Sequence, residues 1–299
     1  MNSRKKRISV KLVGGLGNQL FCYFAGYDLA TRTESRLELE ISDIRSGASV
    51  HASSIESFSL PGDFISADLK QRLSKLGLKN FFIRVMRKLN LLEYFSRKIL
   101  VSQEIGFDPR VLSVKTGTSL FGYFQTYRHF FPYRKEFLGI NLKNPSNWFR
   151  ENLLRMTSDS VIAIHVRRGD YTNLADTYGL LSPEYYERAV EKIREYLPDS
   201  ICWVFSDDPD SANLLLRDVL PATTCWIKPP VDQDAAETML LMSKASGNVI
   251  ANSTFSWWGA ALNSNGGPVI APTKWFKSMP DPKDLYPPAW ITVESSWAG

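Results

Sequence analysis

The chain has 299 residues, of which 44% are hydrophobic and 22% are charged. These ordinary globular values exclude a disordered or fibrous chain, and the length suffices for one large domain or two of average size. The formal net charge of +5 favours an anionic ligand or an anionic membrane surface. The basic residues form no stripe interleaved with aromatic side chains, so nucleic acid is not an expected partner.

The first half opens with a strand, a glycine-rich turn and a helix. Residues 7–12 alternate polar and apolar side chains, residues 14–17 read GGLG, and residues 18–31 have helical apolar spacing. Residues 63–100 also have the apolar spacing of helices, and residues 119–125 form a short β-like apolar run. The polar, turn-rich stretch at 141–147 predicts a boundary between a domain at 1–147 and a domain at 148–299.

The second half alternates strands and helices regularly. The apolar run at 161–164 is typical of a parallel strand that is buried on both faces, and further strands are predicted at 202–205, 224–227, 248–251 and 268–272. Helices are predicted between them at 182–196, 211–220, 235–243 and 253–262. This order predicts a doubly wound parallel sheet.

Three cysteines, Cys22, Cys202 and Cys225, form no CxxC pair and no Cys/His cluster. Each lies in an apolar stretch, which indicates reduced, buried thiols in a reducing compartment. The basic run at residues 4–7 is not followed by a hydrophobic segment, and no apolar run approaches the about 20 residues of a membrane span. We therefore expect a cytoplasmic protein. The basic run is either a solvated tail or a weak attraction to the inner face of the membrane, as in a peripheral protein.

Three polar clusters lie where predicted strands of the second half end. They are His165-Val166-Arg167-Arg168-Gly169-Asp170, Ser206-Asp207-Asp208 and Asn252-Ser253-Thr254. Ligands of open α/β sheets bind outside the carboxyl ends of the strands, so the three clusters are expected to converge on one site. Arginine binds phosphate bidentately, and a helix beginning with serine and threonine binds phosphate through free N–H groups.

Several of these residues have a structural alternative. Arg168 and Asp170 can form an ion pair that holds the turn, and one of Ser253 and Thr254 is expected to cap its helix. Asp207 and Asp208 can accept hydrogen bonds from a guanine edge or a ribose. The sequences Asp208-Pro209-Asp210 and Asp232-Gln233-Asp234 also match the DxD pattern of metal-dependent sugar transferases, but the arginine cations make a metal ion redundant.

The glycine-rich turn reads Gly14-Gly15-Leu16-Gly17-Asn18-Gln19. It resembles a dinucleotide-binding loop but has Leu20 where the third glycine belongs, and the chain has no P-loop sequence. Gly15 and Gly17 nevertheless bring the backbone close to a ligand. The side-chain amide of Asn18 beside them can both donate and accept hydrogen bonds.

Taken together, the sequence resembles the family 11 glycosyltransferases, the α-1,2-fucosyltransferases of bacterial type. The HxRRxD element is also similar to that of α-1,6- and protein O-fucosyltransferases, so it indicates the donor better than the linkage. The matching segments are Gly14 to Gln19, Gly122-Tyr123-Phe124-Gln125, His165 to Tyr171, Phe205-Ser206-Asp207-Asp208 and the run from Ile250 through Asn252-Ser253-Thr254-Phe255 to Ala260.

The resemblance implies an α/β protein of the GT-B type, in which two Rossmann-like domains face a cleft. The domain at 1–147 would bind the acceptor, and the domain at 148–299 would bind GDP-fucose without a metal or other cofactor. Arg167 would meet the β-phosphate, Asp207 would lie near guanine or ribose, and Ser253, Thr254 and Phe255 would line the diphosphate. The wider set of expected donor-binding residues is completed by Gly15, Gly17, Arg168, Asp208 and Asn252.

The implied reaction transfers L-fucose from GDP-β-L-fucose, with inversion, to the 2-hydroxyl of a glycan. The acceptor would be an oligosaccharide or lipid-linked glycan ending in galactose, as in O-antigen. Inversion calls for a base near the acceptor hydroxyl. His165 and Asp170 are candidates for this base, whereas Asn18 could only position a substrate. Alternatives are another fucosyl linkage, a metal-dependent transferase and a non-catalytic sugar-nucleotide-binding protein.

Overall fold

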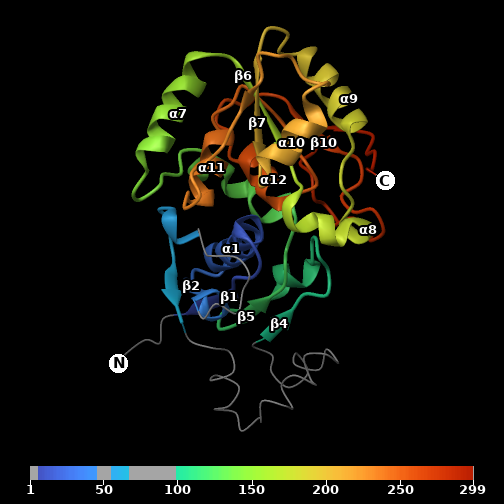
Figure 1. The fold of residues 1–299 in the computed structure, drawn as a ribbon. Coiled ribbons are helices and arrows are strands. Elements are labelled where there is room, and N and C mark those ends of the chain that lie inside the picture. Colours follow the sequence, from blue (N-terminus) through green and yellow to red (C-terminus); the bar gives the residue numbers. More distant parts are fainter. Residues whose placement is uncertain (1–5, 46–54, 67–98, 299) are drawn as a thin grey trace. The chain divides into compact units, whose positions relative to one another are not determined.

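The computed structural model describes residues 6–45, 55–66 and 99–298 (Figure 1). The chain divides into two compact units. The first comprises Met1–Glu56, Leu60–Tyr133 and Pro282–Leu285, and the second comprises Ser57–Ser59, Arg134–Asp281 and Tyr286–Gly299.

The main division falls after Tyr133, rather than after residue 147 as the polar stretch suggests. The helix α6 (Arg134–Phe137) begins the second unit. The Arg134 guanidinium donates to the carbonyls of Ala261 and Asn263, at 3.3 and 2.8 Å, and so ties this segment to the second unit.

The first unit contains a parallel sheet in the order β3-β2-β1-β5-β4. The strands are β1 (Arg7–Lys11), β2 (Arg36–Glu40), β3 (Asp63–Ile65), β4 (Ile99–Val101) and β5 (Ser119–Phe121), and the helices are α1 (Leu16–Arg32) and α2 (Ser42–Arg45). The predicted strand at 7–12 and helix at 18–31 are confirmed as β1 and α1. Helix α1 is buried along most of its length because it packs on β1 and β2.

The predicted helical region at 63–100 is wrong at both ends. Residues 63–65 form β3 and residues 99–101 form β4, because these short apolar segments pair with β2 and β5. The rest of that prediction, at 67–98, lies outside the described residues.

The second unit contains a six-stranded parallel sheet in the order β11-β10-β9-β6-β7-β8. Its strands are β6 (Val161–Val166), β7 (Ile201–Ser206), β8 (Cys225–Trp226), β9 (Gly247–Val249), β10 (Val269–Pro272) and β11 (Ile291–Val293). Its further helices are α7 (Asn147–Ser158), α8 (Ala175–Tyr178), α9 (Pro183–Arg194), α10 (Pro209–Leu216), α11 (Ala235–Met242) and α12 (Thr254–Ala261). Short 3-10 helices occupy Ile55–Ser57, Pro109–Ser113, Tyr127–His129, Phe131–Tyr133 and Gly169–Leu174.

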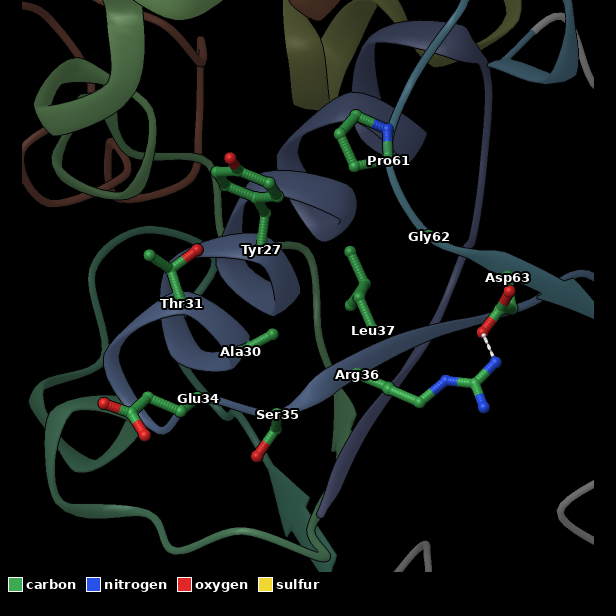
Figure 2. A pocket seen from close by; sticks show the side chains of 10 residues that line it. All are labelled: Tyr27, Ala30, Thr31, Glu34, Ser35, Arg36, Leu37, Pro61, Gly62 and Asp63. Atoms are coloured by element: carbon green, nitrogen blue, oxygen red, sulfur yellow. Dashed lines mark hydrogen bonds and ion pairs between the residues drawn. The ribbon is translucent and has the colours of Figure 1, made fainter. Parts of the chain in front are cut away.

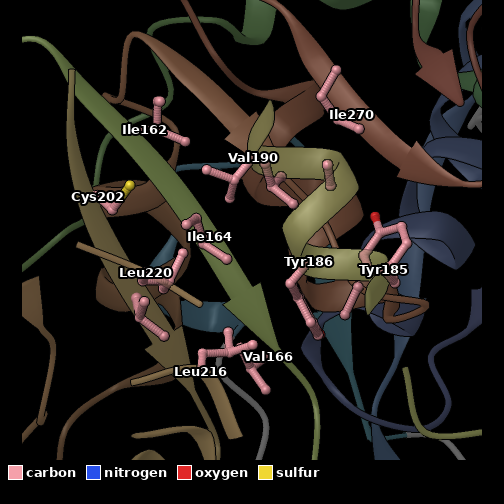
Figure 3. Packing of buried hydrophobic residues seen from close by; sticks show 14 of the residues in the cluster. Ile162, Ile164, Val166, Tyr185, Tyr186, Val190, Cys202, Leu216, Leu220 and Ile270 are labelled. Atoms are coloured by element: carbon pink, nitrogen blue, oxygen red, sulfur yellow. The ribbon is translucent and has the colours of Figure 1, made fainter. Parts of the chain in front are cut away.

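The core of the second unit forms around β6, which is buried at every residue. Its side chains Ile162, Ile164 and Val166 pack with Tyr185, Tyr186 and Val190 of α9 (Figure 3). Such continuous apolar runs are typical of parallel strands covered on both faces, so the strands predicted from these runs are confirmed. The prediction missed β11, a short edge strand that pairs with β10.

The predicted fold class is confirmed as two parallel-sheet α/β units. Within the second unit, β6 and β7 are paired in register from Val161↔Ile201 to Val166↔Ser206. The residues that follow these two strands therefore emerge side by side. In the part of the chain that the structure describes, no helix is both long and apolar enough to cross a membrane.

Candidate functional site

Arg167 and Asp207 follow the paired strands β6 and β7, and their side chains meet. Arg167 NH1 lies 3.1 Å from Asp207 Oδ2, and Asp207 Oδ1 accepts a hydrogen bond from the Arg168 backbone N–H at 2.9 Å. Both side chains keep some exposure, 19% for Arg167 and 24% for Asp207. The first and second polar clusters thus converge at the carboxyl edge of the sheet.

The two arginines of the first cluster have different surroundings. The Arg167 guanidinium lies over the Tyr171 ring, 4.9 Å from its centre. Arg168 is buried, and its guanidinium donates to the Leu181 carbonyl at 3.0 Å. The contacts of Arg168 are therefore with the protein itself. The side chain of Asp170 lies outside the described residues, so the alternative ion pair with Arg168 stays a prediction.

His165 connects the first cluster to the third. Its ring lies 5.5 Å from that of Phe255 in α12, measured between centroids. Burial lowers the pKa of His165 to about 3, with a smaller contribution from the Arg167 charge. Its Nδ1 is buried without a hydrogen-bond partner among the described residues. The imidazole is therefore neutral near pH 7, and a base this weak is poorly matched to proton abstraction at that pH.

The third cluster forms the start of helix α12. Ser253 occupies the N-cap position, yet its hydroxyl makes no cap hydrogen bond. The first N–H groups of a helix lack intrahelical partners, and the helix dipole favours an anion there. The Asn252 side-chain amide instead donates to the carbonyls of Tyr178, Gly179 and Trp275, at 2.9, 3.2 and 3.2 Å, and so fixes the loop before the helix.

The other carboxylates near this edge have structural partners. Asp208 caps α10, accepting from Ser211 N at 3.1 Å and from Ser211 Oγ at 2.6 Å, and these hydrogen bonds hold its pKa below the ordinary value. Asp210 pairs with Lys228 at 2.6 Å, and Asp234 caps α11. Among the described residues, no three His, Cys, Asp or Glu side chains gather in a metal-binding group.

In the first unit, the glycine-rich turn and helix α1 contact the segment Gly122-Tyr123-Phe124-Gln125. Asn18 Oδ1 accepts a hydrogen bond from Gln125 Nε2 at 3.0 Å, and Cys22 Sγ donates to the Gly122 carbonyl at 3.3 Å. Gly14 has a φ of 68°, and a Cβ there would stand 2.7 Å from Asn18 Nδ2. The turn therefore requires glycine at this position for both its backbone and its contact with Asn18.

Gly15 caps α1, and Gly17 is buried in its first turn. Sequence reasoning assigned no role to Gln125 or Tyr171, although both stand inside the quoted motifs. The position of Tyr171 four residues after Arg167 was the signal in the sequence that could have predicted their contact. Nothing in the sequence shows that Gln125 meets Asn18, because 107 residues separate them.

A separate hollow of about 390 Å³ lies in the first unit (Figure 2). Its lining includes the apolar side chains of Ala30 and Leu37 and the ion pair Arg36–Asp63, at 2.6 Å. It lies at the C-terminal end of α1 and at the amino ends of β2 and β3, away from the glycine-rich turn. None of the predicted site residues lines it, so it is not the candidate site.

The two parallel-sheet α/β units agree with a fold of the GT-B type, and Arg167, Asp207 and the start of α12 lie at the carboxyl edge of one sheet, where open α/β folds bind ligands. The chain belongs to glycosyl transferase family 11, whose model matches residues 79–294. The predicted family is thereby confirmed.

The relatives agree with this assignment. The chain is 26% identical to an alpha-1,2-colitosyltransferase of Escherichia coli, over 96% of this chain and 99% of that protein. It is 29% identical to the O-antigen biosynthesis glycosyltransferase WbnK of Escherichia coli, over 94% and 99% respectively. The structure of an Arabidopsis thaliana FUT1 variant in complex with GDP covers 91% of this chain and 71% of its own, with 14% identity and a TM-score of 0.51, a likeness of the fold alone.

Proposed function

We propose that the protein transfers L-fucose from GDP-β-L-fucose, with inversion, to the 2-hydroxyl of a galactose residue in a surface glycan. Membership of family 11 and the similarity to an O-antigen glycosyltransferase support this class of reaction. The observation that carries the proposal is the cluster of Arg167, Phe255 and the uncapped N-terminus of α12 at one sheet edge.

The chemistry of the reaction fits that cluster. As the bond from the sugar C1 to the diphosphate breaks, the sugar becomes oxocarbenium-like and negative charge builds on the leaving group. Fixed positive groups that meet this charge stabilise the transition state more than the ground state. Arg167 would bind the β-phosphate, while Ser253, Thr254 and Phe255 would bind the diphosphate at the helix start. The second unit is then the donor domain and the first is the acceptor domain.

The choice of general base is part of the proposal. The low pKa of His165 disfavours it as a base, and the amide of Asn18 cannot take up a proton. Asp170 is the remaining candidate from the sequence, and we propose it for this role. Asn18, whose amide is oriented by Gln125, would position an acceptor or donor hydroxyl.

The test is a panel of galactose-terminated acceptors with GDP-fucose, followed by methylation analysis of the product. The proposal expects acceptor-dependent release of GDP and a 2-linked galactose. Substitution at another hydroxyl would instead show a different fucosyl linkage. Binding of GDP-fucose without acceptor-dependent release of GDP under any condition would show a non-catalytic sugar-nucleotide-binding protein.

The similarity to the colitosyltransferase supports a second candidate donor. Colitose is fucose without its 3-hydroxyl, and a site that hydrogen-bonds a hydroxyl can reject an analogue lacking it by about 10⁴-fold. The ratio of kcat/KM for GDP-fucose and GDP-colitose therefore decides between the two. A strong preference for GDP-colitose would replace fucose in the proposal and leave the site chemistry unchanged.

A lipid-linked acceptor would bring the protein to the inner face of the membrane. Co-flotation with anionic vesicles, with and without the basic run at residues 4–7, tests whether that run contributes.

A further inference from the structure

Three contacts converge on the carboxylate of Asp207. Its Oδ2 lies 3.1 Å from Arg167 NH1, and its Oδ1 accepts the Arg168 backbone N–H at 2.9 Å. A Cβ on Gly169 would stand 2.2 Å from Oδ2, so the close approach of the carboxylate requires glycine there. Both oxygens are therefore directed at the turn that follows β6.

The Arg167 guanidinium is also held by an aromatic ring. Its carbon lies 4.9 Å from the centre of the Tyr171 ring, and that ring stacks on Tyr178 at 5.0 Å with an interplanar angle of 25°. A carboxylate beside a guanidinium and a ring over its face restrain different motions of the group. Arg167 is thus oriented from two directions before any ligand binds.

We propose that Asp207 is a positioning residue that directs the Arg167 guanidinium toward the diphosphate, and that it does not contact guanine or ribose. This inference rests on the proposed function. A guanidinium has five N–H donors and can contact a carboxylate and a phosphate at the same time. Without the carboxylate Arg167 keeps its charge but loses one of the two restraints on its orientation.

Orientation matters most in the transition state, where the leaving charge is largest. The carboxylate also partly neutralises Arg167, so removing it does not simply weaken binding of the ground-state diphosphate. Loss of the positioning by Asp207 is therefore expected to lower kcat. A direct contact to guanine would instead be seen in nucleotide affinity and base preference.

Asp207→Asn separates these roles. The asparagine Oδ1 still accepts the Arg168 N–H, which preserves the turn, while its NH₂ group faces Arg167 in place of an acceptor. We expect kcat to fall about tenfold or more, with KM for GDP-fucose changed by less than about threefold. Asp210→Asn is the matched control, because it makes the same change in an exposed side chain that pairs with Lys228 on the surface, and it should retain wild-type kcat.

A double-mutant cycle tests whether Asp207 acts through Arg167. In an Arg167→Ala background, Asp207→Asn should cause no further loss of kcat. Independent, multiplicative losses would overturn the proposal.

The preference for GDP over ADP, measured by calorimetry, gives a readout without turnover. The proposal expects the same preference in wild type and Asp207→Asn, and a lost preference would show a direct contact to the base. This measurement stands even if the wild type transfers no fucose, a result that would defeat the proposed function alone.

Gly169→Ala provides a second variant that changes no charge. The added methyl displaces Asp207 Oδ2 from Arg167 and should reproduce the loss of kcat with unchanged base preference. Wild-type kcat in folded Gly169→Ala would also contradict the proposal.

Discussion

At the scale of single residues, Arg167 combines a fixed charge, partial exposure and a defined orientation. Its neighbour Arg168 is buried against a backbone carbonyl, and Asn252 and Asp208 are likewise engaged by the protein. Of the residues expected to bind the donor, those at the start of α12 and Arg167 are the ones whose surroundings suit an anionic ligand.

Arg167→Ala should lower kcat by about 10²-fold or more, or roughly 3 kcal/mol, the scale of one lost electrostatic donor. Arg167→Lys should restore little of this loss, since a point charge cannot reproduce bidentate binding. Steady-state kinetics with GDP-fucose and an accepted glycan would measure both. Near-wild-type turnover in either variant would contradict the assignment of Arg167.

His165 makes stability depend on pH in a defined direction. Its pKa is about 3 in the folded protein and about 6.5 in the unfolded chain, so the unfolded state binds more protons between these values. The free energy of unfolding should therefore fall as the pH drops below 6.5, by up to about 1.4 kcal/mol per unit from this residue.

Replacing His165 by glutamine removes its contribution to the pH dependence of the free energy of unfolding. The stability advantage of the wild type over His165→Gln should shrink by up to about 2 kcal/mol between pH 7 and pH 5. Urea unfolding of both proteins at the two pH values measures the change. A constant difference would show that His165 is not buried in its neutral form.

At the scale of elements, three helices have a serine at the N-cap. Ser146 caps α7, accepting from Phe149 N at 3.1 Å, whereas Ser182 at α9 and Ser253 at α12 make no such bond. The Ser182 hydroxyl donates to Glu184 instead. An ordinary N-cap contributes about 1 kcal/mol, which the Ser253 hydroxyl does not supply to α12. Its hydroxyl and the neighbouring N–H groups are suited to a phosphate.

The matched variants Ser146→Ala and Ser253→Ala should therefore have opposite effects. Ser146→Ala should lower the thermal midpoint, by the equivalent of about 1 kcal/mol, and leave GDP affinity unchanged. Ser253→Ala should cost little stability but weaken GDP binding. Thermal scans and calorimetry on the same samples compare them, and a larger thermal loss in Ser253→Ala would identify it as an ordinary cap.

At the scale of the whole molecule, the proposed site would meet the diphosphate with positive charge from Arg167 and a helix start. We therefore expect full activity in EDTA with GDP-fucose as donor. Restoration of an EDTA-inhibited enzyme by Mg²⁺ or Mn²⁺ would instead favour a metal-dependent mechanism.

The sequence predicted the second unit well, because β6, β7 and β10 are continuous apolar runs and polar clusters follow β6 and β7. It also predicted that the clusters at Arg167, Asp207 and Ser253 converge, since carboxyl ends of parallel strands share an edge. It could not predict the partners of Arg167 and Arg168, because the Leu181 carbonyl and the Asp207 carboxylate are brought near only by the fold. The strands β3, β4 and β11 were not predicted, because a segment of three residues is too short to have a recognisable periodicity.

The two units are interleaved along the chain, and this has a consequence for synthesis. Pro282–Leu285 belongs to the first unit, where the Lys283 carbonyl accepts from Phe107 N at 3.0 Å and the Asp284 carboxylate lies 2.8 Å from Arg128 Nε. Domains usually complete their folding in the order in which they leave the ribosome. Here the first unit lacks these contacts until Pro282–Leu285 has been synthesised. Its earlier segments therefore cannot complete their folding before residues Arg134–Asp281 of the second unit have been made.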